Sequence, residues 1–314
     1  MAIVKNKANW SGLSGSLPTS RGDVGRAVVV ATGIGLVLAL TIDIVTGRWV
    51  GSPWLHVLLA LFLVAAWMPL GRKVSYLQWA PLYVLGLLVY TVLRSFADQT
   101  AIAPRSDLVI AIEEKLFLGH VPTVWLQQHL FRPAHLGPLD FLTVQVHWSF
   151  FFVPHVGAAL VFLYRRELFP RYMFLIMGTF YLGLLLYFLV PTVPPWLAAD
   201  YGTLPRVARV MDYVGRQVDP NTYNRFYDAL GVPNAVAAMP SLHMGVTFAV
   251  YLFVRDINRR LSWVLLAYSL LMGFSLVYMG EHYATDVIVG AICALVVYRA
   301  YHLYHNHVER RSRA

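Results

Sequence analysis

Two short polar motifs near the C-terminus contain the residues best suited to chemistry. Met239–His243 reads MPSLH and Gly280–Asp286 reads GEHYATD, and each motif lies at the edge of an apolar run. Histidine exchanges protons near neutral pH, so His243 and His282 could act as an acid and a base. Asp286 follows His282 by four residues, which puts both on one helix face and lets the carboxylate orient the imidazole. The stretch between the histidines, roughly 40 residues, can cross a bilayer twice, so both are expected at the same membrane surface.

An apolar composition defines the class of protein that positions these motifs. Of the 314 residues, 58% are hydrophobic and only 13% are charged, and the mean hydropathy is +0.58. A soluble domain of this length needs far more charge, so we predict an all-α, polytopic membrane helix bundle. The net charge of +9 is distributed between hydrophobic segments and forms no continuous stripe, so no nucleic-acid partner is expected.

Two further features of the sequence exclude simple alternatives. Cys293 is the only cysteine, so neither a disulfide nor a cysteine metal cage can form within one chain. Met1–Arg26 is polar and basic, with no apolar core flanked by a small-residue cleavage site. A cleaved signal peptide is therefore not expected.

Eight apolar runs have the character of membrane spans. They are residues 27–46, 54–70, 77–94, 139–164, 172–190, 241–255, 262–280 and 284–304. No internal repeat or low-complexity linker divides the chain, so one integrated helical unit is predicted. Within it we expect a cytoplasmic N-terminus with two accessory helices (1–76), a catalytic membrane domain (77–304) and a basic cytoplasmic tail (305–314).

The distribution of basic residues predicts the orientation of the chain. If both termini are cytoplasmic, most of the 25 Lys and Arg residues lie on the inner side, including those of the short loops Tyr164–Tyr172 and Arg255–Leu261. This topology puts His243 and His282 at the exoplasmic face, periplasmic or extracellular in a bacterium and lumenal in a secretory organelle. The charge bias and the motif spacing are independent observations that agree.

Two longer outer segments, 95–138 and 191–240, are expected to roof the site and hold a head group. The first contains amphipathic stretches, and the second begins with prolines that must end a helix and continues with polar helix candidates. These features are Ile112–Phe117, Val124–Leu130, Pro191–Trp196, Pro205–Tyr213 and Tyr223–Leu230. The alternative is that both segments are connectors without a role in the site.

Pro240 and Ser241 are typical of a helix start, with proline near the first turn and serine able to cap it. The free N–H groups and the dipole of such a helix end favour a phosphate. His243 would then lie in the first turn, close to the bound anion. This arrangement suits phosphoryl chemistry.

In combination, the two motifs resemble those of the type 2 phosphatidic acid phosphatase (PAP2) superfamily. Pro240–His243 followed by His282–Val287 is most similar to the branch of sphingolipid synthases and inositol phosphorylceramide synthases, whose second motif reads HYxxDV. Val190–Trp196, with its double proline, and Leu116–Thr123 also look like that branch. The resemblance covers residues 77–304 and implies a catalytic core of six membrane helices.

The resemblance also implies a metal-independent, cofactor-free transfer through a phosphohistidine. His282 would attack phosphorus while Asp286 fixes its tautomer, and His243 would protonate the departing lipid alkoxide and later deprotonate the incoming hydroxyl. Positions implied to bind substrate are Ser241, Pro240, Tyr283 and Pro194.

Two departures from the family pattern bear on the reaction. Phosphatases of this superfamily carry a KxxxxxxRP motif, which is not found here, and an arginine six residues before the second histidine, where this chain has Leu276. A phosphodiester carries one charge fewer than a phosphomonoester, so a weaker clamp suffices for it. The departures therefore favour head-group transfer over monoester hydrolysis. Arginines on the predicted outer side that could supply a substitute clamp are Arg94, Arg105 and Arg206, and also Arg209 and Arg225.

The sequence thus predicts a membrane phosphotransferase that moves a phospho-head group, such as phosphoinositol, from a phospholipid donor to a lipid or polyol hydroxyl. A lipid or polyprenyl phosphate phosphatase, a proton-coupled transporter and a metal-dependent hydrolase are the alternatives. His147 and His155 are eight residues apart and face similar sides of one predicted span. We expect them to pair with buried partners and not to catalyse.

Overall fold

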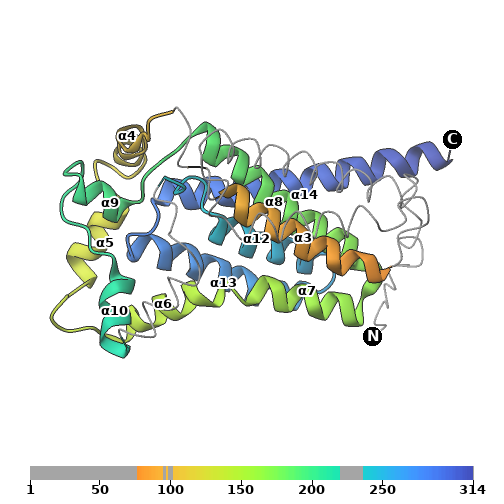
Figure 1. Ribbon diagram of the computed structural model, residues 1–314, viewed down its shortest axis with the longest axis horizontal. Helices are drawn as coiled ribbons and strands as arrows, with labels where there is room; N and C mark the ends of the chain where they lie inside the picture. Colours follow the sequence, from red (N-terminus) through yellow and green to blue (C-terminus); the bar gives the residue numbers. More distant parts are fainter. Residues whose placement is uncertain (1–75, 95–96, 98–101, 220–235, 314) are drawn as a thin grey trace, which may run out of the picture.

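A computed structural model of the chain describes residues 76–94, 97, 102–219 and 236–313. Every regular element in these ranges is a helix, and the one β-bridge pairs Thr192 with Ala237. Long helices run side by side along the molecule, and a group of short helices covers one end of them, opposite the C-terminus (Figure 1). The predicted runs 27–46 and 54–70 lie outside the described residues.

Seven helices form the bundle, and they match the six remaining apolar runs. They are α3 (Tyr76–Arg94), α6 (Pro138–Ser149), α7 (Val153–Tyr164), α8 (Phe169–Leu189), α12 (Leu242–Arg255), α13 (Arg259–Tyr278) and α14 (Ala284–Arg313), with a short 3₁₀ turn, η3 (Arg166–Leu168), before α8. Among the described residues, three segments are long and apolar enough to cross a membrane: Arg166–Leu189, Arg259–Tyr278 and Ala284–His307. The protein is therefore an integral membrane protein with an all-helical described core.

The predicted span at 139–164 is broken in the structure into α6 and α7, which meet at an angle of 43°. Pro154 lies in the first turn of α7. Proline has no N–H and its ring clashes with the preceding turn, so one straight helix cannot run through this position. Counted together, the two helices make a fourth candidate span in the described part of the chain.

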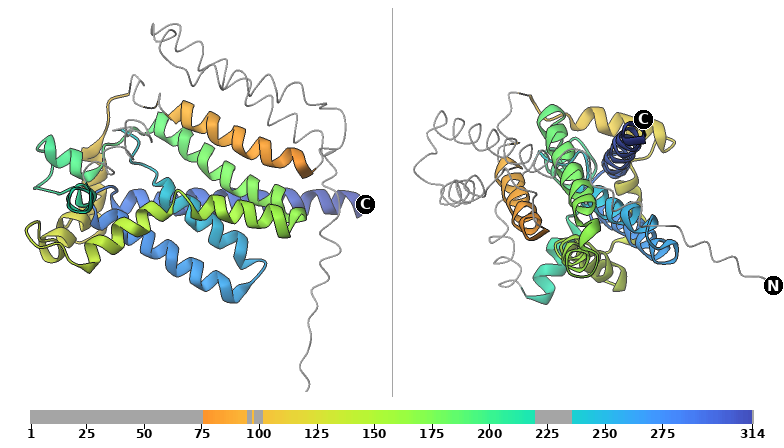
Figure 2. Two further views of the ribbon diagram at one scale, coloured as in Figure 1. Left: turned by 60° about the horizontal axis from the view of Figure 1, so that its bottom comes forward. Right: turned by 90° about the vertical axis from the view of Figure 1, so that its right-hand side faces the viewer.

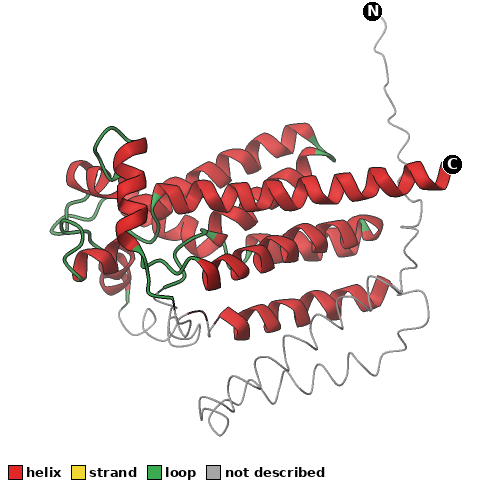
Figure 3. Cartoon of the chain, turned by 90° about the horizontal axis from the view of Figure 1, so that it is seen from above, coloured by secondary structure: helices red, strands yellow, loops and turns green. Residues whose placement is uncertain are grey.

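Four short helices form a cap over one end of the bundle, as Figures 2 and 3 show from further sides. They are α4 (Ser106–Leu116), α5 (Pro122–Leu130), α9 (Pro195–Asp200) and α10 (Val210–Val218). The first two contain the predicted amphipathic stretches, and α10 overlaps the predicted helix at 205–213. The prolines end α8 at Leu189 as expected, and the candidate at 223–230 lies outside the residues that the structure describes.

Helix α12 lies in the centre and packs against α8, α13 and α14. At 14 residues it is about 21 Å long, shorter than a bilayer core. Its contact with α14 depends on two glycines: a Cβ on Gly290 would lie 2.1 Å from the Ser241 carbonyl oxygen, and one on Gly245 would lie 2.9 Å from the Gly290 carbonyl oxygen. This close approach brings the starts of α12 and α14, and with them both motifs, to the capped end.

Candidate active site

His282 and Asp286 form a buried pair where α14 begins. The imidazole is 6% exposed and the aspartate 0%. His282 Nδ1 lies 3.4 Å from Asp286 Oδ2, which also accepts a 2.9 Å hydrogen bond from the Tyr283 N–H. The contact with the imidazole is long for a hydrogen bond, and such bonds often shorten when substrate binds. Because the carboxylate faces Nδ1, it is Nε2 of His282 that remains available to a substrate.

His243 faces this pair from the first turn of α12, with its ring centroid 5.8 Å from that of His282. Ser241 is the N-cap of the helix, and its Oγ accepts a hydrogen bond from the Met244 N–H at 3.4 Å. The Ser241 N–H donates to the Asp286 carbonyl oxygen at 2.9 Å, which ties the two motifs together through the backbone. The predicted helix start at Pro240–Ser241 is thus confirmed.

His147 is a third imidazole beside the other two, a position that the sequence did not predict, since it indicated only a buried partner for this residue. It is 5% exposed, its ring centroid lies 4.7 Å from that of His243, and its Nδ1 is buried without a hydrogen-bond partner. Phe150, which directly follows the last residue of α6, packs against the His243 ring at a centroid distance of 4.3 Å. By contrast, His155 has the expected buried partner, the Tyr83 hydroxyl at 3.0 Å. Nothing in the sequence distinguished the two histidines. Their surroundings differ because the chain breaks between α6, which carries His147, and α7, which carries His155.

Glu113 of the cap reaches the same helix start. Its Oε1 accepts hydrogen bonds from the Thr285 N–H at 2.7 Å and from the Thr285 hydroxyl at 3.0 Å. The side chain is 0% exposed and Oε2 has no partner. Burial raises the pKa of Glu113 to about 7, and the nearby Asp286 adds to the rise, although the bonds from Thr285 oppose it. A carboxylate at a helix N-terminus satisfies free N–H groups, and this one connects the cap to the start of α14.

The loop before His282 is hydrogen-bonded to the cap along its length. The Gln127 side chain donates to the carbonyl oxygens of Tyr278 and Ala208, both at 2.8 Å, and accepts from the Ala208 N–H at 2.7 Å. The Val210 N–H donates to Met279 O, and the Trp196 N–H donates to Gly280 O, both at 3.2 Å. The cap therefore fixes the position of this loop and does not merely cover it.

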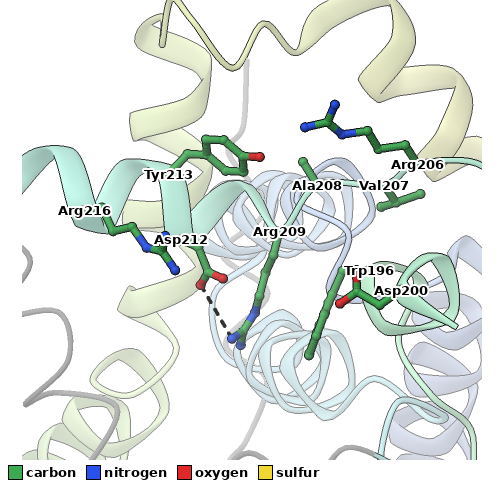
Figure 4. Close-up of a pocket in the computed structure, with 9 residues that line it drawn as sticks. All are labelled: Trp196, Asp200, Arg206, Val207, Ala208, Arg209, Asp212, Tyr213 and Arg216. Atoms are coloured by element: carbon green, nitrogen blue, oxygen red, sulfur yellow. Dashed lines mark ion pairs between the residues drawn. The ribbon is translucent and has the colours of Figure 1, made fainter.

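A pocket of about 400 Å³ opens in the cap beside this loop (Figure 4). We call it the cap pocket; its lining combines Trp196 and Tyr213 with three arginines and two aspartates: Arg206, Arg209, Arg216, Asp200 and Asp212. The Arg209 guanidinium pairs with Glu281 at 2.7 Å and lies 4.9 Å from the centre of the Trp196 ring. Glu281 directly precedes His282, so the pocket adjoins the loop that carries this histidine.

The other predicted site residues lie at different depths. Arg94, at the end of α3, is close enough to His243 for its charge to act on the imidazole, whereas Arg105 is exposed at the start of α4. Arg206 is exposed at the cap pocket. Pro194, Pro240 and Tyr283 are buried, and the Tyr283 hydroxyl has no hydrogen-bond partner. Arg225 lies outside the described residues, and substrate contact by any of these side chains stays a prediction.

Leu276 occupies a position that cannot hold a charged side chain without rearrangement. It is 0% exposed and belongs to the central hydrophobic cluster of the bundle. Arg209 of the cap instead pairs with Glu281, the residue directly before His282. The positive charge at this site therefore comes from the cap and from the end of α3.

Comparisons with known proteins agree with this geometry. The family model described as PAP2 superfamily matches residues 108–300. A phosphoinositol dihydroceramide synthase of Bacteroides thetaiotaomicron is 28% identical over 45% of this chain and 48% of its own length. An inositol phosphorylceramide synthase of Candida albicans is 29% identical over 49% of the chain and 33% of its own length.

A shorter match points to a different reaction. An undecaprenyl-diphosphatase of Bacillus subtilis is 33% identical over 21% of this chain and 35% of its own length. The chain thus spans about half or less of the length of each of these three curated relatives. No solved structure matches it.

Proposed function

Because the chain belongs to the PAP2 superfamily, we propose that it is a membrane phosphotransferase that moves a phospho-head group from a phosphodiester lipid to a hydroxyl acceptor. The observation that carries the proposal is the convergence of His243, His282 and Asp286 at the capped end of the bundle. Two of the relatives are named as synthases that form phosphoinositol-bearing ceramides, which supports a diester donor such as phosphatidylinositol.

In the first half-reaction, Nε2 of His282 attacks phosphorus and the bond from phosphorus to the diacylglycerol oxygen breaks. His243 gives its proton to the departing alkoxide, so the products are diacylglycerol and a phosphohistidine that still carries the head group. Asp286 holds the imidazole by Nδ1 and stabilises the positive charge that develops on the ring.

In the second half-reaction, an acceptor hydroxyl attacks phosphorus and the bond to His282 breaks. His243, now neutral, takes the hydroxyl proton and returns to its starting state. Ser241 and the first N–H groups of α12 hold the non-bridging oxygens, with Arg94 and Arg209 contributing positive charge. His147 packs against the acid–base imidazole and keeps its ring in the orientation that both steps need.

The topology expected from the charge distribution fits this site. Both catalytic helices start at the capped end, and the C-terminus lies at the other end of the bundle (Figure 1). With a cytoplasmic C-terminus, the cap and the active site are exoplasmic. The catalytic membrane domain is then 77–304, preceded by an N-terminal region with two accessory spans and followed by a basic tail.

A phosphatase acting on a lipid or polyprenyl phosphate is the second candidate, and the match to an undecaprenyl-diphosphatase favours it. The same phosphohistidine would form, with water in place of the acceptor. The buried Leu276 argues against it, because a monoester dianion needs more positive charge than the described site provides.

The test uses purified full-length protein in detergent with EDTA, given a diester lipid or a monoester lipid, with and without a hydroxyl acceptor. Mass spectrometry should show a new lipid that bears the head group, and H282A should abolish it. The matched control is H129A, since His129 is exposed on α5 of the cap. Phosphate released from the monoester alone would establish the phosphatase instead. An active H282A variant would rule out the assigned nucleophile, and no conversion of either lipid would favour the transporter.

A further inference from the structure

The cap pocket has a lining that suits a particular class of head group. It combines guanidinium and carboxylate groups, which together donate and accept hydrogen bonds to hydroxyls. Arg206 and Arg216 make no ion pair with any residue in the described ranges, so both can bind an added anion or hydroxyl. In Figure 4 the Arg209 side chain points toward Asp212, and Trp196 stands beside it.

The same lining disfavours cationic head groups. Quaternary ammonium groups are usually bound over the faces of aromatic rings. Here the Arg209 guanidinium already lies over the Trp196 ring at 4.9 Å, and Arg206 and Arg216 add positive charge nearby. A choline or ethanolamine group would meet three guanidinium groups against two carboxylates, one of which, Asp212, already pairs with Arg209, and an aromatic ring that is occupied.

The pocket is built on the loop that carries the nucleophile. The Arg209–Glu281 ion pair joins it to the residue before His282, and the hydrogen bond from the Trp196 N–H to Gly280 O adds a second link. A group bound there contacts Arg209, whose partner Glu281 directly precedes His282, and it lies in the cap, outside the apolar bundle. This is where the polar end of a lipid must go when its acyl chains lie among the membrane helices.

From these observations we propose that the cap pocket holds the head group of the diester donor, and that this head group is a hydroxylated, non-cationic one such as a polyol. The proposal rests on the transferase function given above. It assigns the pocket a role in both half-reactions, because the head group stays bonded to phosphorus in the phosphohistidine. The bond to diacylglycerol breaks and the bond to the acceptor forms, while the bond from phosphorus to the polyol oxygen is retained throughout.

The experiment compares donors with identical acyl chains and different head groups: phosphatidylinositol, phosphatidylglycerol, phosphatidylethanolamine and phosphatidylcholine. The wild type should prefer the first two. The double variant R206A/R216A should lower the ratio of kcat/KM for phosphatidylinositol over phosphatidylethanolamine by about 10-fold, since it removes two donors that the polyol uses. R132A is the matched control, because Arg132 is exposed in the cap outside the pocket, and it should leave the ratio unchanged.

A binding measurement keeps this proposal separate from the proposed reaction. Thermal shifts of H282A protein should be larger with inositol 1-phosphate than with phosphoethanolamine or inorganic phosphate, and R206A/R216A should remove the difference. Wild type that turns over diesters while the double variant keeps its selectivity would overturn the pocket assignment alone. Selective binding without turnover of any diester would instead leave the pocket assigned and overturn the transferase.

Discussion

Two polar clusters lie at opposite ends of the bundle, and their carboxylates, the partly exposed Asp256 and the buried Asp286, have different surroundings. Near the C-terminal end of α12, Asp256 accepts from the Tyr298 hydroxyl at 3.0 Å, lies 3.2 Å from His302 Nε2 and pairs with Arg171. At the capped end, Asp286 meets His282 at 3.4 Å and leaves Oδ1 without a partner. The first carboxylate is saturated by its neighbours and the second is not.

The capped end leaves other polar atoms unpaired as well. Glu113 Oε2, His147 Nδ1 and the Tyr283 hydroxyl are buried there without hydrogen-bond partners, whereas Arg171 Nε is the one such atom of the described residues at the far end. An unpaired buried polar group costs about 1–3 kcal/mol, so a cluster of them is not explained by stability. We infer that the far cluster holds α8, α12 and α14 together and that the capped cluster is kept for chemistry.

The largest expected effect comes from D286N. The amide keeps the shape of the side chain but removes the charge that stabilises imidazolium and fixes its tautomer, so kcat should fall by about 10³ to 10⁴-fold. Head-group transfer by purified protein measures it, with circular dichroism as the control for folding. Retention of more than a tenth of the activity would contradict the inference that the capped cluster is kept for chemistry.

The E113Q substitution should change how stability depends on pH. The pKa of Glu113 is raised by burial from 4.5 to about 7, so the folded protein favours the neutral acid. Its contribution to stability is fully present below pH 4.5 and is lost as the pH rises toward 7, a change of at most about 3 kcal/mol. Glutamine does not ionise, so E113Q should exceed the wild type in Tm at pH 8 and approach it near pH 5. A constant difference in Tm across this range would contradict the assignment.

The D256N substitution should lower stability and spare the reaction. The ion pair with Arg171 and the contact with His302 weaken, and because the carboxylate is partly exposed the expected loss is about 1–2 kcal/mol. Thermal unfolding in detergent measures this loss, and kcat per folded molecule should stay within about 3-fold of wild type. A large loss of kcat with unchanged Tm would mean that the far cluster also takes part in catalysis.

The last comparison is between H147F and H155F. Phenylalanine keeps an aromatic ring against His243 but loses the polar edge, so kcat should fall about 10-fold with KM little changed. H155F loses only the contact with Tyr83 and should affect Tm and not kcat. Equal kinetic effects of the two substitutions would show that His147 contributes packing only and does not orient His243.

The motifs and their general positions could be predicted from the sequence because local rules govern them. Apolar runs indicate membrane helices, prolines at 191–195 end α8, and Ser241 caps α12. The four-residue spacing of His282 and Asp286 predicts a contact between them, which the structure shows at 3.4 Å, although His282 lies two residues before α14 begins and not on one face of the helix. These features depend on a few neighbouring residues.

Only the tertiary structure decided which distant residues complete the site. Glu113 is 172 positions from Thr285, yet its carboxylate binds the first turn of α14, and Arg209 reaches Glu281 across 72 positions. His147 and His155 have the same residue type and similar periodic positions, but the bend at Pro154 sends one to the active site and the other to Tyr83. Packing between segments far apart in the chain sets such contacts, and no local spacing encodes them. The sequence by itself therefore determined which groups we propose to react, and the packing of the cap on the bundle decided what surrounds them.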